Sequence, residues 1–511
     1  MKYDVIVDCY TDEPSGLGVP PFLSVHSRYI AGALEEQKRK YYYLTIDDLR
    51  YSNGEKHNND SYNKRIINTT KNKDNVFDIL NNASNIYVVM GCFVKYEYVS
   101  AEPPSFLEVE NLLRKYSANK LLFYSLGGNE LTRENVRKTV PQGLFDEIIF
   151  GNTYNYFIGE TSNKFKPNYD RLKNIAISSA TVLNQLERPL VIEIETATGC
   201  NRKPGCTFCI EGMRGLPLQF REVEDIVSEI KSLYDNGALY FRLGRQPNFY
   251  AYKDCNPSEI EKLFKRIWEE CPNIKTLHID NVSPHNVNTP EGIKITEIVA
   301  KYTTAGNITP FGIESFDPRI RELCNLNGSL NDIHESINII NRFGKERGDN
   351  GLPKLLPGIN IIYGLDGQSE KTLDYNLNNF KRILDSGNWV RRVFVRKLTS
   401  PYGEQFDRYA KDKLDEFKNW SSTIENDFTI PMLKQVFPVG LIIKDLRMEM
   451  YKDGNSILRQ MATCPVRVVE KNKELKLDQF YTVKIIGYVG NRTLLGEVIW
   501  KKSDYLFQKQ I

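Results

Sequence analysis

The sequence predicts an α/β protein in three parts: a doubly wound domain, a partial (β/α) barrel and a small C-terminal β-barrel. Three observations support this prediction. Short apolar runs alternate with helical stretches up to about residue 160, and a second alternation spans residues 190–400. From about Lys434 the chain changes to short alternating strands separated by glycines. Domain limits are therefore expected at residues 1–165, 185–430 and 434–511.

The first domain is expected to contain five parallel strands with helices between them. These strands are predicted at residues 3–8, 41–46, 85–90, 120–126 and 146–150. Ligands of such sheets bind at the carboxyl ends of the strands, which here lead into the loops Cys9–Pro21, Gly91–Tyr98 and Gly127–Asn129. The pattern predicts a flavodoxin-like domain, in which loop glycines let a ligand approach the backbone closely.

The second part of the chain predicts six parallel strands of a barrel. Its strands are expected at residues 191–195, 238–243, 276–280, 308–315, 356–365 and 390–397, with helices at 223–233, 257–270 and 330–342. In such a barrel the carboxyl ends of all strands face one mouth, where the active site lies. Polar residues that follow these strands are therefore candidates for the site.

Three cysteines follow the first barrel strand, in the run V-I-E-I-E-T-A-T-G-C-N-R-K-P-G-C-T-F-C. Cys200, Cys206 and Cys209 have the spacing C-x5-C-x2-C. Three thiolates can hold three corners of a [4Fe–4S] cluster, and since no fourth cysteine lies near, one iron would stay open to a chelating molecule. A zinc site is the alternative, but it normally needs four ligands, and no Cys or His pair follows at a suitable spacing.

This motif resembles that of the radical S-adenosylmethionine (SAM) superfamily, whose usual spacing is C-x3-C-x2-C. Phe208 stands where the family has an aromatic residue before the last ligand, and the two additional residues fall in a turn with Pro204 and Gly205. The resemblance implies that SAM binds the open iron. One electron then cleaves SAM into methionine and a 5′-deoxyadenosyl radical.

Later strand ends also resemble the SAM-contacting motifs of this family. Gly244-Arg245-Gln246 stands where the family has Gly-Gly-Glu, which binds the methionine amino group, and the amide oxygen of Gln246 can accept that hydrogen bond. Glu314 and Ser315 resemble a strand end whose polar residues reach the ribose or the carboxylate. Ordinary turn chemistry is the alternative for each of these residues.

The last two barrel strands complete the set. The turn from Gly364 to Gly367 resembles the family's turn beneath the adenine, although Asp366 and Gln368 replace its proline and glutamate. Arg396, near the end of the last strand, could pair with the SAM carboxylate as a bidentate fork.

A flavodoxin-like domain ahead of such a barrel resembles the layout of the cobalamin-binding subclass. The D-x-H-x-x-G motif that supplies an axial histidine is absent. Two interpretations of the first domain therefore stay open: a cobalamin-binding domain, and a substrate-recognition or degenerate domain. Methylthiotransferases of the family carry three further cysteines in their first domain. Here only Cys9 and Cys92 lie at strand ends, and buried thiols are favoured over a second cluster.

The C-terminal module resembles a TRAM-type or OB-like β-barrel, which in RNA-modifying members of the family binds tRNA. A capping barrel without RNA contact is the alternative. Basic and aromatic residues alternate there as on an RNA surface: Lys484, Tyr488, Arg492, Lys501 and Lys502. Cys464 precedes the module and is either a radical-quenching thiol, a metal ligand or an inert buried thiol. The full layout resembles an archaeal group of radical SAM proteins.

Composition limits the location and the partners. A net charge of +3 on 511 residues gives no overall signature of polyanion binding, and no run of 18 apolar residues predicts a membrane span. Nine cysteines without a paired framework fit a reducing compartment. We expect an oxygen-sensitive cytoplasmic enzyme without a membrane anchor.

Together these features predict a radical SAM transferase. The leading hypothesis is methyl or methylthio transfer to a macromolecule, with RNA favoured over protein because of the terminal barrel. The alternatives are cobalamin-linked methylation or rearrangement of a small molecule, and a cluster-bearing protein without catalysis. A reductant such as ferredoxin or flavodoxin is expected as a partner.

Overall fold

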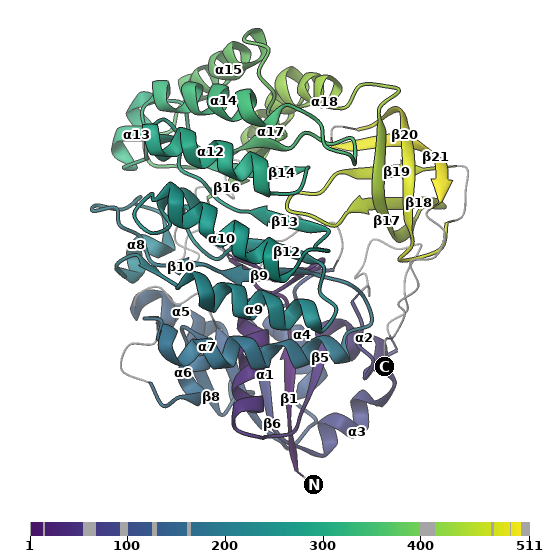
Figure 1. Ribbon diagram of the computed structural model, residues 1–511. Coiled ribbons are helices and arrows are strands. Elements are labelled where there is room, and N and C mark those ends of the chain that lie inside the picture. Colours follow the sequence, from purple (N-terminus) through teal and green to yellow (C-terminus); the bar gives the residue numbers. More distant parts are fainter. Residues whose placement is uncertain are drawn as a thin grey trace. The chain divides into compact units, whose positions relative to one another are not determined.

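The computed structural model describes residues 2–13, 16–54, 68–91, 101–124, 130–160, 165–398, 414–471, 475–490 and 492–501. The chain forms two compact units (Figure 1). The first comprises Met1–Asn281 with Thr399–Tyr409, and the second comprises Val282–Leu398 with Ala410–Ile511. The domain limits expected from the sequence stay a prediction.

A five-stranded parallel sheet begins the first unit. Its order is β5-β1-β6-β7-β8, so the strand that comes first in the chain lies second in the sheet. The strands are β1 (Tyr3–Asp8), β5 (Tyr41–Thr45), β6 (Ala83–Met90), β7 (Asn119–Tyr124) and β8 (Glu147–Phe150). This order confirms the doubly wound, flavodoxin-like arrangement, whose switch point lies between β1 and β6.

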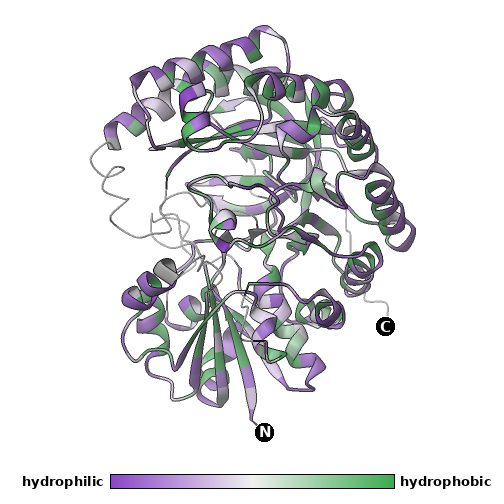
Figure 2. Ribbon diagram, turned by 90° about the vertical axis from the view of Figure 1, so that its left-hand side faces the viewer, coloured by the Kyte–Doolittle hydropathy of each residue, from purple (hydrophilic) through white to green (hydrophobic). Residues whose placement is uncertain are grey.

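Helices cover this sheet and bury its apolar strands, which are largely green in Figure 2. Val5, Val7 and Val88 are fully buried. The helices are α1 (Val25–Glu36), α2 (Ile46–Ser52), α3 (Val76–Asn81), α4 (Phe106–Leu113), α5 (Glu130–Thr139), α6 (Thr153–Phe157) and α7 (Tyr169–Ser178), with two 3-10 turns, η1 (Lys73–Asn75) and η2 (Ser179–Gln185). Helix α1 begins after Ser24, which caps it by accepting a hydrogen bond from the His26 N–H at 3.1 Å.

A second parallel sheet in the same unit contains the first barrel strands. Its order is β13-β12-β9-β4, with β9 (Val191–Glu195), β12 (Tyr240–Gly244), β13 (Thr276–Ile279) and the short β4 (Phe22–Leu23). Helices α9 (Val223–Asp235) and α10 (Pro257–Glu270) pack against each other, and η3 (Phe249–Ala251) precedes α10. The pairing of β4 with β9 was not expected, and it joins the N-terminal segment to the barrel.

A buried ion-pair network links the two sheets of the first unit. The Arg28 guanidinium on α1 lies 2.5 Å from the Glu229 carboxylate on α9, and both side chains are fully buried. Arg221 pairs with the same carboxylate. Arg28 also donates to the Glu193 carbonyl of β9 at 2.9 Å. Helix α1 is therefore joined to the first barrel strand and to the first barrel helix.

The second unit contains a parallel sheet of the order β14-β15-β16. These strands are β14 (Asn307–Glu314), β15 (Leu355–Tyr363) and β16 (Arg392–Lys397). The helices around them are α11 (Pro284–Val287), α12 (Pro290–Tyr302), α13 (Pro318–Leu323), α14 (Leu330–Gly344), α15 (Glu370–Asp385), α17 (Leu414–Ile424) and α18 (Ile430–Val436), with the π-turn η4 (Glu425–Thr429). The structure thus has a strand at each of the six ranges that the sequence analysis expected, three in each unit.

A closed five-stranded barrel ends the chain. Its order is β17-β18-β19-β21-β20, which confirms the predicted C-terminal β-module. The strands are β17 (Ile442–Lys452), β18 (Asn455–Gln460), β19 (Arg467–Glu470), β20 (Phe480–Val489) and β21 (Thr493–Lys501). Among the described helices, none combines the length and the apolar character that crossing a membrane requires.

Candidate functional site

The three-cysteine loop is held at both ends in the first unit. The short strand β10 (Ala197–Thr198) pairs with β11 (Gln219–Phe220), and the Cys200 N–H donates to the Leu216 carbonyl at 3.1 Å. Gly199 has a φ of +91°, and a Cβ there would lie 2.2 Å from the Pro217 oxygen. Only glycine fits this close approach, so the sequence places the first cysteine at a defined point after β9.

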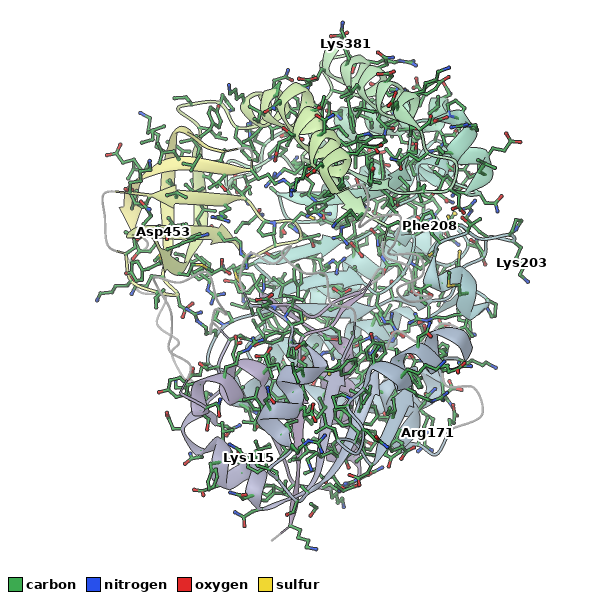
Figure 3. The ribbon with its side chains drawn as sticks, turned by 180° about the vertical axis from the view of Figure 1, so that it is seen from behind. Lys115, Arg171, Lys203, Phe208, Lys381 and Asp453 are labelled. Atoms are coloured by element: carbon green, nitrogen blue, oxygen red, sulfur yellow. The ribbon has the colours of Figure 1, made fainter. Side chains whose placement is uncertain are left out.

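All three cysteines of this loop are free thiols with partly exposed side chains. The Cys206 sulfur accepts a hydrogen bond from the Arg202 guanidinium at 2.8 Å, and the Cys209 N–H donates to the Cys206 carbonyl at 3.1 Å. Burial raises the pKa of the Cys209 thiol to about 12, although backbone N–H groups of Glu211 and Gly212 oppose the shift. These donors favour the thiolates that a metal needs. Lys203, on the same loop, is exposed (Figure 3).

The number of thiols in the loop matches the protein ligands of a [4Fe–4S] cluster with one open iron. A cubane cluster binds each thiolate to a different iron. The three thiols, with N–H donors beside two of them, therefore suit a [4Fe–4S] cluster.

Gln246 lies in the same unit, directly after β12. It is 1% exposed, its Oε1 accepts from the Thr196 hydroxyl at 3.2 Å, and its Nε2 donates to the Leu243 carbonyl. The space over Gly244 is filled by the Glu193 carboxylate, because a Cβ there would meet Glu193 Oε1 at 2.1 Å. The predicted SAM contact of Gln246 must use the second lone pair of its amide oxygen.

Charged residues inside β9 and β12 were missed by the sequence analysis. Glu193 is buried, pairs with Arg242 at 2.7 Å and accepts from the Arg245 N–H at 2.9 Å. Burial raises the pKa of Glu193 to about 7, with Arg242 opposing the shift. The two glutamates in V-I-E-I-E could have indicated this ion pair, because a charged side chain buried in a barrel strand needs a partner. Arg245 also has a φ of +59°, which is rare outside glycine and marks this strand end.

Glu314, at the end of β14, belongs to the second unit. Its φ of +60° is left-handed, and a Cβ at Gly312 would lie 2.8 Å from its Oε1. Burial raises the pKa of Glu314 to about 8, although Arg396 and Arg321 oppose the shift. The carboxyl is therefore mostly protonated at neutral pH and can both donate and accept a hydrogen bond, which suits ribose hydroxyls.

Replacing Glu314 with glutamine is expected to change how stability depends on pH. The pKa rises from its ordinary 4.5 to about 8 on folding. The stability that the protonated carboxyl contributes is therefore fully present below pH 4.5 and is lost as the pH rises to about 8. Above pH 8 the Glu314→Gln variant should be the more stable protein, by up to a few kcal/mol. Urea unfolding across this range measures the effect.

Glu322, an exposed glutamate on α13, provides the control. The Glu322→Gln variant should differ from wild type by the same small amount at every pH. If the stability of Glu314→Gln relative to wild type does not increase between pH 4.5 and pH 8, the interpretation of Glu314 as a buried, protonated carboxyl is wrong.

The remaining predicted SAM contacts also lie in the second unit. Ser315 is buried, and its hydroxyl accepts from the Asp317 N–H at 3.1 Å. Gly364 and Gly367 have φ values of +96° and +78°, and the Gly364 N–H donates to Gln368 Oε1 at 2.6 Å. Both positions need glycine for conformation, and a Cβ at Gly367 would also lie 2.5 Å from Leu323 Cδ1. Arg396 interacts electrostatically with Glu314, so these two predicted residues lie near each other.

The predicted residues thus form two groups. Cys200, Cys206, Phe208, Cys209, Gly244 and Gln246 lie in the first unit, and Glu314, Ser315, Gly364, Gly367 and Arg396 lie in the second. Their roles as ligands stay predictions.

The carboxyl edge of the N-terminal sheet is filled by its own side chains at β1 and β5. Asp8 accepts hydrogen bonds from the Ser27 hydroxyl and the Tyr43 hydroxyl, both at 2.6 Å. Arg50 pairs with Asp47 at 2.9 Å, and both are fully buried. These side chains occupy the carboxyl ends of β1 and β5, and residues 92–100 after β6 lie outside the described residues, so we derive no step through cobalamin.

The other predicted features of that edge lie mostly outside the described residues. Cys92 and the loop Gly127–Asn129 are among them. Cys9 is 1% exposed, and burial raises the pKa of its thiol well above the ordinary value. Its surroundings are those of a buried structural thiol, while the second cluster stays a prediction without a test.

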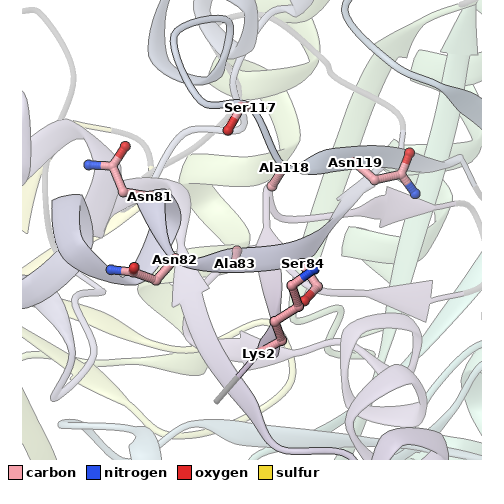
Figure 4. Close-up of a pocket in the computed structure, with 8 residues that line it drawn as sticks. All are labelled: Lys2, Asn81, Asn82, Ala83, Ser84, Ser117, Ala118 and Asn119. Carbon is pink, nitrogen blue, oxygen red and sulfur yellow. The ribbon is translucent and has the colours of Figure 1, made fainter.

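A shallow polar depression of about 520 Å³ lies at the opposite, amino edge of the same sheet (Figure 4). Its lining comes from residues at the starts of β6 and β7, just before them, and before β1: Lys2, Asn81, Asn82, Ala83, Ser84, Ser117, Ala118 and Asn119. No predicted site residue is among them. The depression is therefore separate from the candidate site.

A partial (β/α) barrel whose first strand leads into a loop of three free thiols defines a class of iron–sulfur enzymes. Residues 194–377 match the radical SAM superfamily. An uncharacterized protein of Methanocaldococcus jannaschii is 33% identical, over 97% of this chain and 93% of its own length. The chain belongs to the radical SAM superfamily. Enzymes of this superfamily use a [4Fe–4S] cluster and SAM, and they need a reductant.

Two further proteins are similar over much of the chain. The tRNA-2-methylthio-N(6)-dimethylallyladenosine synthase of Clostridium tetani is 21% identical over 75% of this chain and 78% of its own length. The solved structure of the cobalamin-dependent S-adenosylmethionine radical enzyme OxsB, with aqua-cobalamin and S-adenosylmethionine bound, is 12% identical with a TM-score of 0.45. That match covers 82% of this chain and 56% of the OxsB chain.

Proposed function

We propose that this radical SAM enzyme transfers a methyl or methylthio group to a macromolecule, with RNA as the favoured acceptor. The observation that carries the proposal is the loop of three free thiols pinned after the first barrel strand. Cys200, Cys206 and Cys209 are the proposed ligands of the [4Fe–4S] cluster. The two residues by which this loop exceeds the usual C-x3-C-x2-C spacing fall in the turn around Pro204 and Gly205.

When bound, the cluster and SAM together supply a 5′-deoxyadenosyl radical after one-electron reduction. The chain's own residues bind and orient the cluster and SAM. Arg202 donates to the Cys206 sulfur, which favours its thiolate. Phe208, Gly244, Gln246, Glu314, Ser315, Gly364, Gly367 and Arg396 are the proposed contacts of SAM.

RNA as the acceptor is supported by the closed C-terminal barrel and by its charge. Lys484 is exposed on β20, and Arg492 is exposed in the turn between β20 and β21. Tyr488 lies beside Lys434, whose ammonium is 5.9 Å from the ring centroid. Lys502 lies outside the described residues. Cations among aromatic rings are the surface that single-stranded RNA binds, and the tRNA-modifying relative adds support.

Cobalamin-linked methylation of a small molecule is the second candidate. The observation in its favour is the strand order of the first sheet, which is that of a ligand-binding doubly wound domain. A cluster protein without catalysis is the third candidate. Ferredoxin or flavodoxin as the reductant, and a cytoplasmic location, stay predictions.

An assay with methyl-labelled SAM tests the acceptor. Anaerobically reconstituted protein, a reductant and labelled SAM are incubated with a tRNA pool, and the tRNA is digested to nucleosides. We expect label in a nucleoside together with 5′-deoxyadenosine. Neither should form with Cys206→Ala, whereas both should persist with Cys255→Ala, a matched change at a cysteine outside the loop.

Other outcomes point elsewhere. Label in an added small-molecule extract but never in RNA would favour the second candidate and contradict RNA as the acceptor. A stable cluster without any 5′-deoxyadenosine would favour the third candidate.

A further inference from the structure

Glu314 lies in a strained turn at the end of β14. Its φ is +60°, and the Ser315 N–H donates to the Ile313 carbonyl at 2.7 Å, so the three residues form a γ-turn. A γ-turn with a positive φ at its central residue is rare and strained. The pairing with β15 also shifts between Gly312 and Glu314, which is a β-bulge, and bulges beside active sites re-aim side chains. Such a conformation persists only where the surrounding structure fixes it.

The guanidinium of Arg321, on α13, contacts this turn on both sides of Glu314. Its Nη1 donates to the Ile313 carbonyl at 3.0 Å and to the Ser315 carbonyl at 2.8 Å. Its Nη2 donates to two carbonyls of the loop after α13, at 2.5 and 2.6 Å. Arg321 is 7% exposed, so water competes little for these hydrogen bonds. The two bonds of Nη1 fix the backbone on either side of Glu314, and with it the direction in which the Glu314 side chain leaves the strand.

A guanidinium is the side-chain group that suits this arrangement. It is planar, keeps its charge in a protein and carries five N–H donors in a fixed geometry. A lysine ammonium has the same charge, but its three donors leave from a single nitrogen. The Arg321→Lys variant would therefore keep the positive charge and lose part of the four hydrogen bonds. This separates the contacts of Arg321 with the turn from the electrostatic effect of its charge.

The turn places the Glu314 carboxyl above Gly312, because a Cβ at Gly312 would lie 2.8 Å from Glu314 Oε1. Gly312 is exposed, so the packed carboxyl lies beside accessible space. Burial raises the pKa of this carboxyl from 4.5 to about 8, and the charges of Arg396 and Arg321 oppose the rise. Because burial is the largest cause of the shift, the pKa of Glu314 reports whether its side chain stays in this position.

We propose that Arg321 is a positioning residue for SAM binding, which keeps Glu314 in the left-handed turn from which the Glu314 side chain meets SAM. That Glu314 contacts SAM rests on the proposed function. The effect of Arg321 on the turn does not, because its contacts with the turn lie within the protein. The alternative is that Arg321 only joins α13 to its neighbours, in which case its replacement would change stability and nothing at Glu314.

Infrared spectroscopy of the anaerobically reconstituted full chain, without SAM, tests the effect on the turn. A protonated carboxyl has a carbonyl band that a carboxylate lacks, and the band of Glu314 is the one that Glu314→Gln removes. In wild type this band should disappear with a midpoint at about pH 8. In Arg321→Lys the carboxyl should leave its buried position, so the midpoint should fall toward the ordinary value of 4.5.

Arg347→Lys is the matched control. Arg347 is a partly buried arginine that also donates to main-chain carbonyls, those of Gly351 at 2.9 Å and Val436 at 2.6 Å, and both contacts lie outside the turn of β14. Thermal unfolding should show a loss of stability in both lysine variants, whereas the midpoint in Arg347→Lys should stay at about pH 8. An unchanged midpoint in Arg321→Lys as well would overturn the proposal.

Equilibrium dialysis with labelled SAM, on the same reconstituted protein, tests the consequence for the site. Arg321→Lys and Glu314→Ala should each weaken SAM binding about tenfold, and Arg347→Lys should leave it unchanged. If Arg321 acts through Glu314, the double variant should lose about tenfold in total rather than about a hundredfold, because the effects of coupled residues do not add. Arg321→Gln with Glu314→Ala gives a second cycle, which serves if the lysine variant unfolds.

The outcomes separate this proposal from the proposed function. Additive losses of SAM affinity in the double variant would overturn the proposal. Wild-type affinity in Glu314→Ala, together with a lowered midpoint in Arg321→Lys, would uphold the effect of Arg321 on the turn and contradict the proposed contact of Glu314 with SAM. Neither measurement requires the transfer of a methyl or methylthio group, so both can succeed where the proposed function fails.

Discussion

Replacing Glu229 with alanine is expected to destabilise the first unit by about 3–5 kcal/mol, because two guanidinium groups then stay buried without a counter-charge. Glu229 pairs with Arg28 and with Arg221, and all three side chains are at most 1% exposed. Burial alone would raise the pKa of Glu229, but Arg221 and Arg28 outweigh it and lower the pKa. The contribution of this carboxylate is therefore present above about pH 4.5 and is lost as the pH falls below it.

The control is on the same helix. Asp235 of α9 pairs with Lys231 at 2.9 Å, and about half of each side chain is exposed. Asp235→Ala should change stability by no more than about 0.5 kcal/mol. Urea unfolding at pH 7 compares the two variants. Equal midpoints would show that the network between α1 and α9 is not a main source of stability.

Replacing any one of Cys200, Cys206 and Cys209 with alanine is expected to remove the [4Fe–4S] cluster or leave it labile. Each thiolate is the sole protein ligand proposed for one iron, and no cysteine outside the loop follows closely enough to substitute. Iron and sulfide content, visible absorbance and electron paramagnetic resonance of the reduced protein measure the loss. SAM cleavage should fall to the background.

Cys255→Ala and Cys271→Ala are the matched controls, because both thiols lie outside the loop in the same unit. They should keep wild-type iron content. A full cluster in all three loop variants would contradict the ligand assignment, and loss of iron in the controls would place a ligand outside the loop.

Much of the barrel could be predicted because its signals are local. Helix α10 occupies the expected residues, since Asn256 caps it and Pro257 fills its first position. Helix α9 ends as expected before Gly237, whose φ is +96°. The loop of three cysteines could be predicted from the spacing of its cysteines alone. These features depend on a few neighbouring residues, and that is why a single sequence contains them.

The rest depends on contacts that are distant in the chain. The pairing of β4 with β9 joins Phe22–Leu23 to residues far along the sequence. A strand of only two residues is too short to show the alternation of apolar and polar residues that predicts a strand. The contact between Phe394 of β16 and Arg492, in the turn between β20 and β21, likewise joins two distant segments. Helix α12 is different, because its signals, Thr289 as the cap and Pro290 in the first turn, were present and were missed.

Formation of 5′-deoxyadenosine tests the central claim most directly. The protein is reconstituted anaerobically with iron and sulfide, reduced with dithionite and given SAM, and 5′-deoxyadenosine and methionine are quantified. We predict equal amounts of both products, dependent on the reductant and absent with Cys206→Ala. An intact [4Fe–4S] cluster that binds SAM but yields neither product would contradict the assignment of this chain as an active radical SAM enzyme.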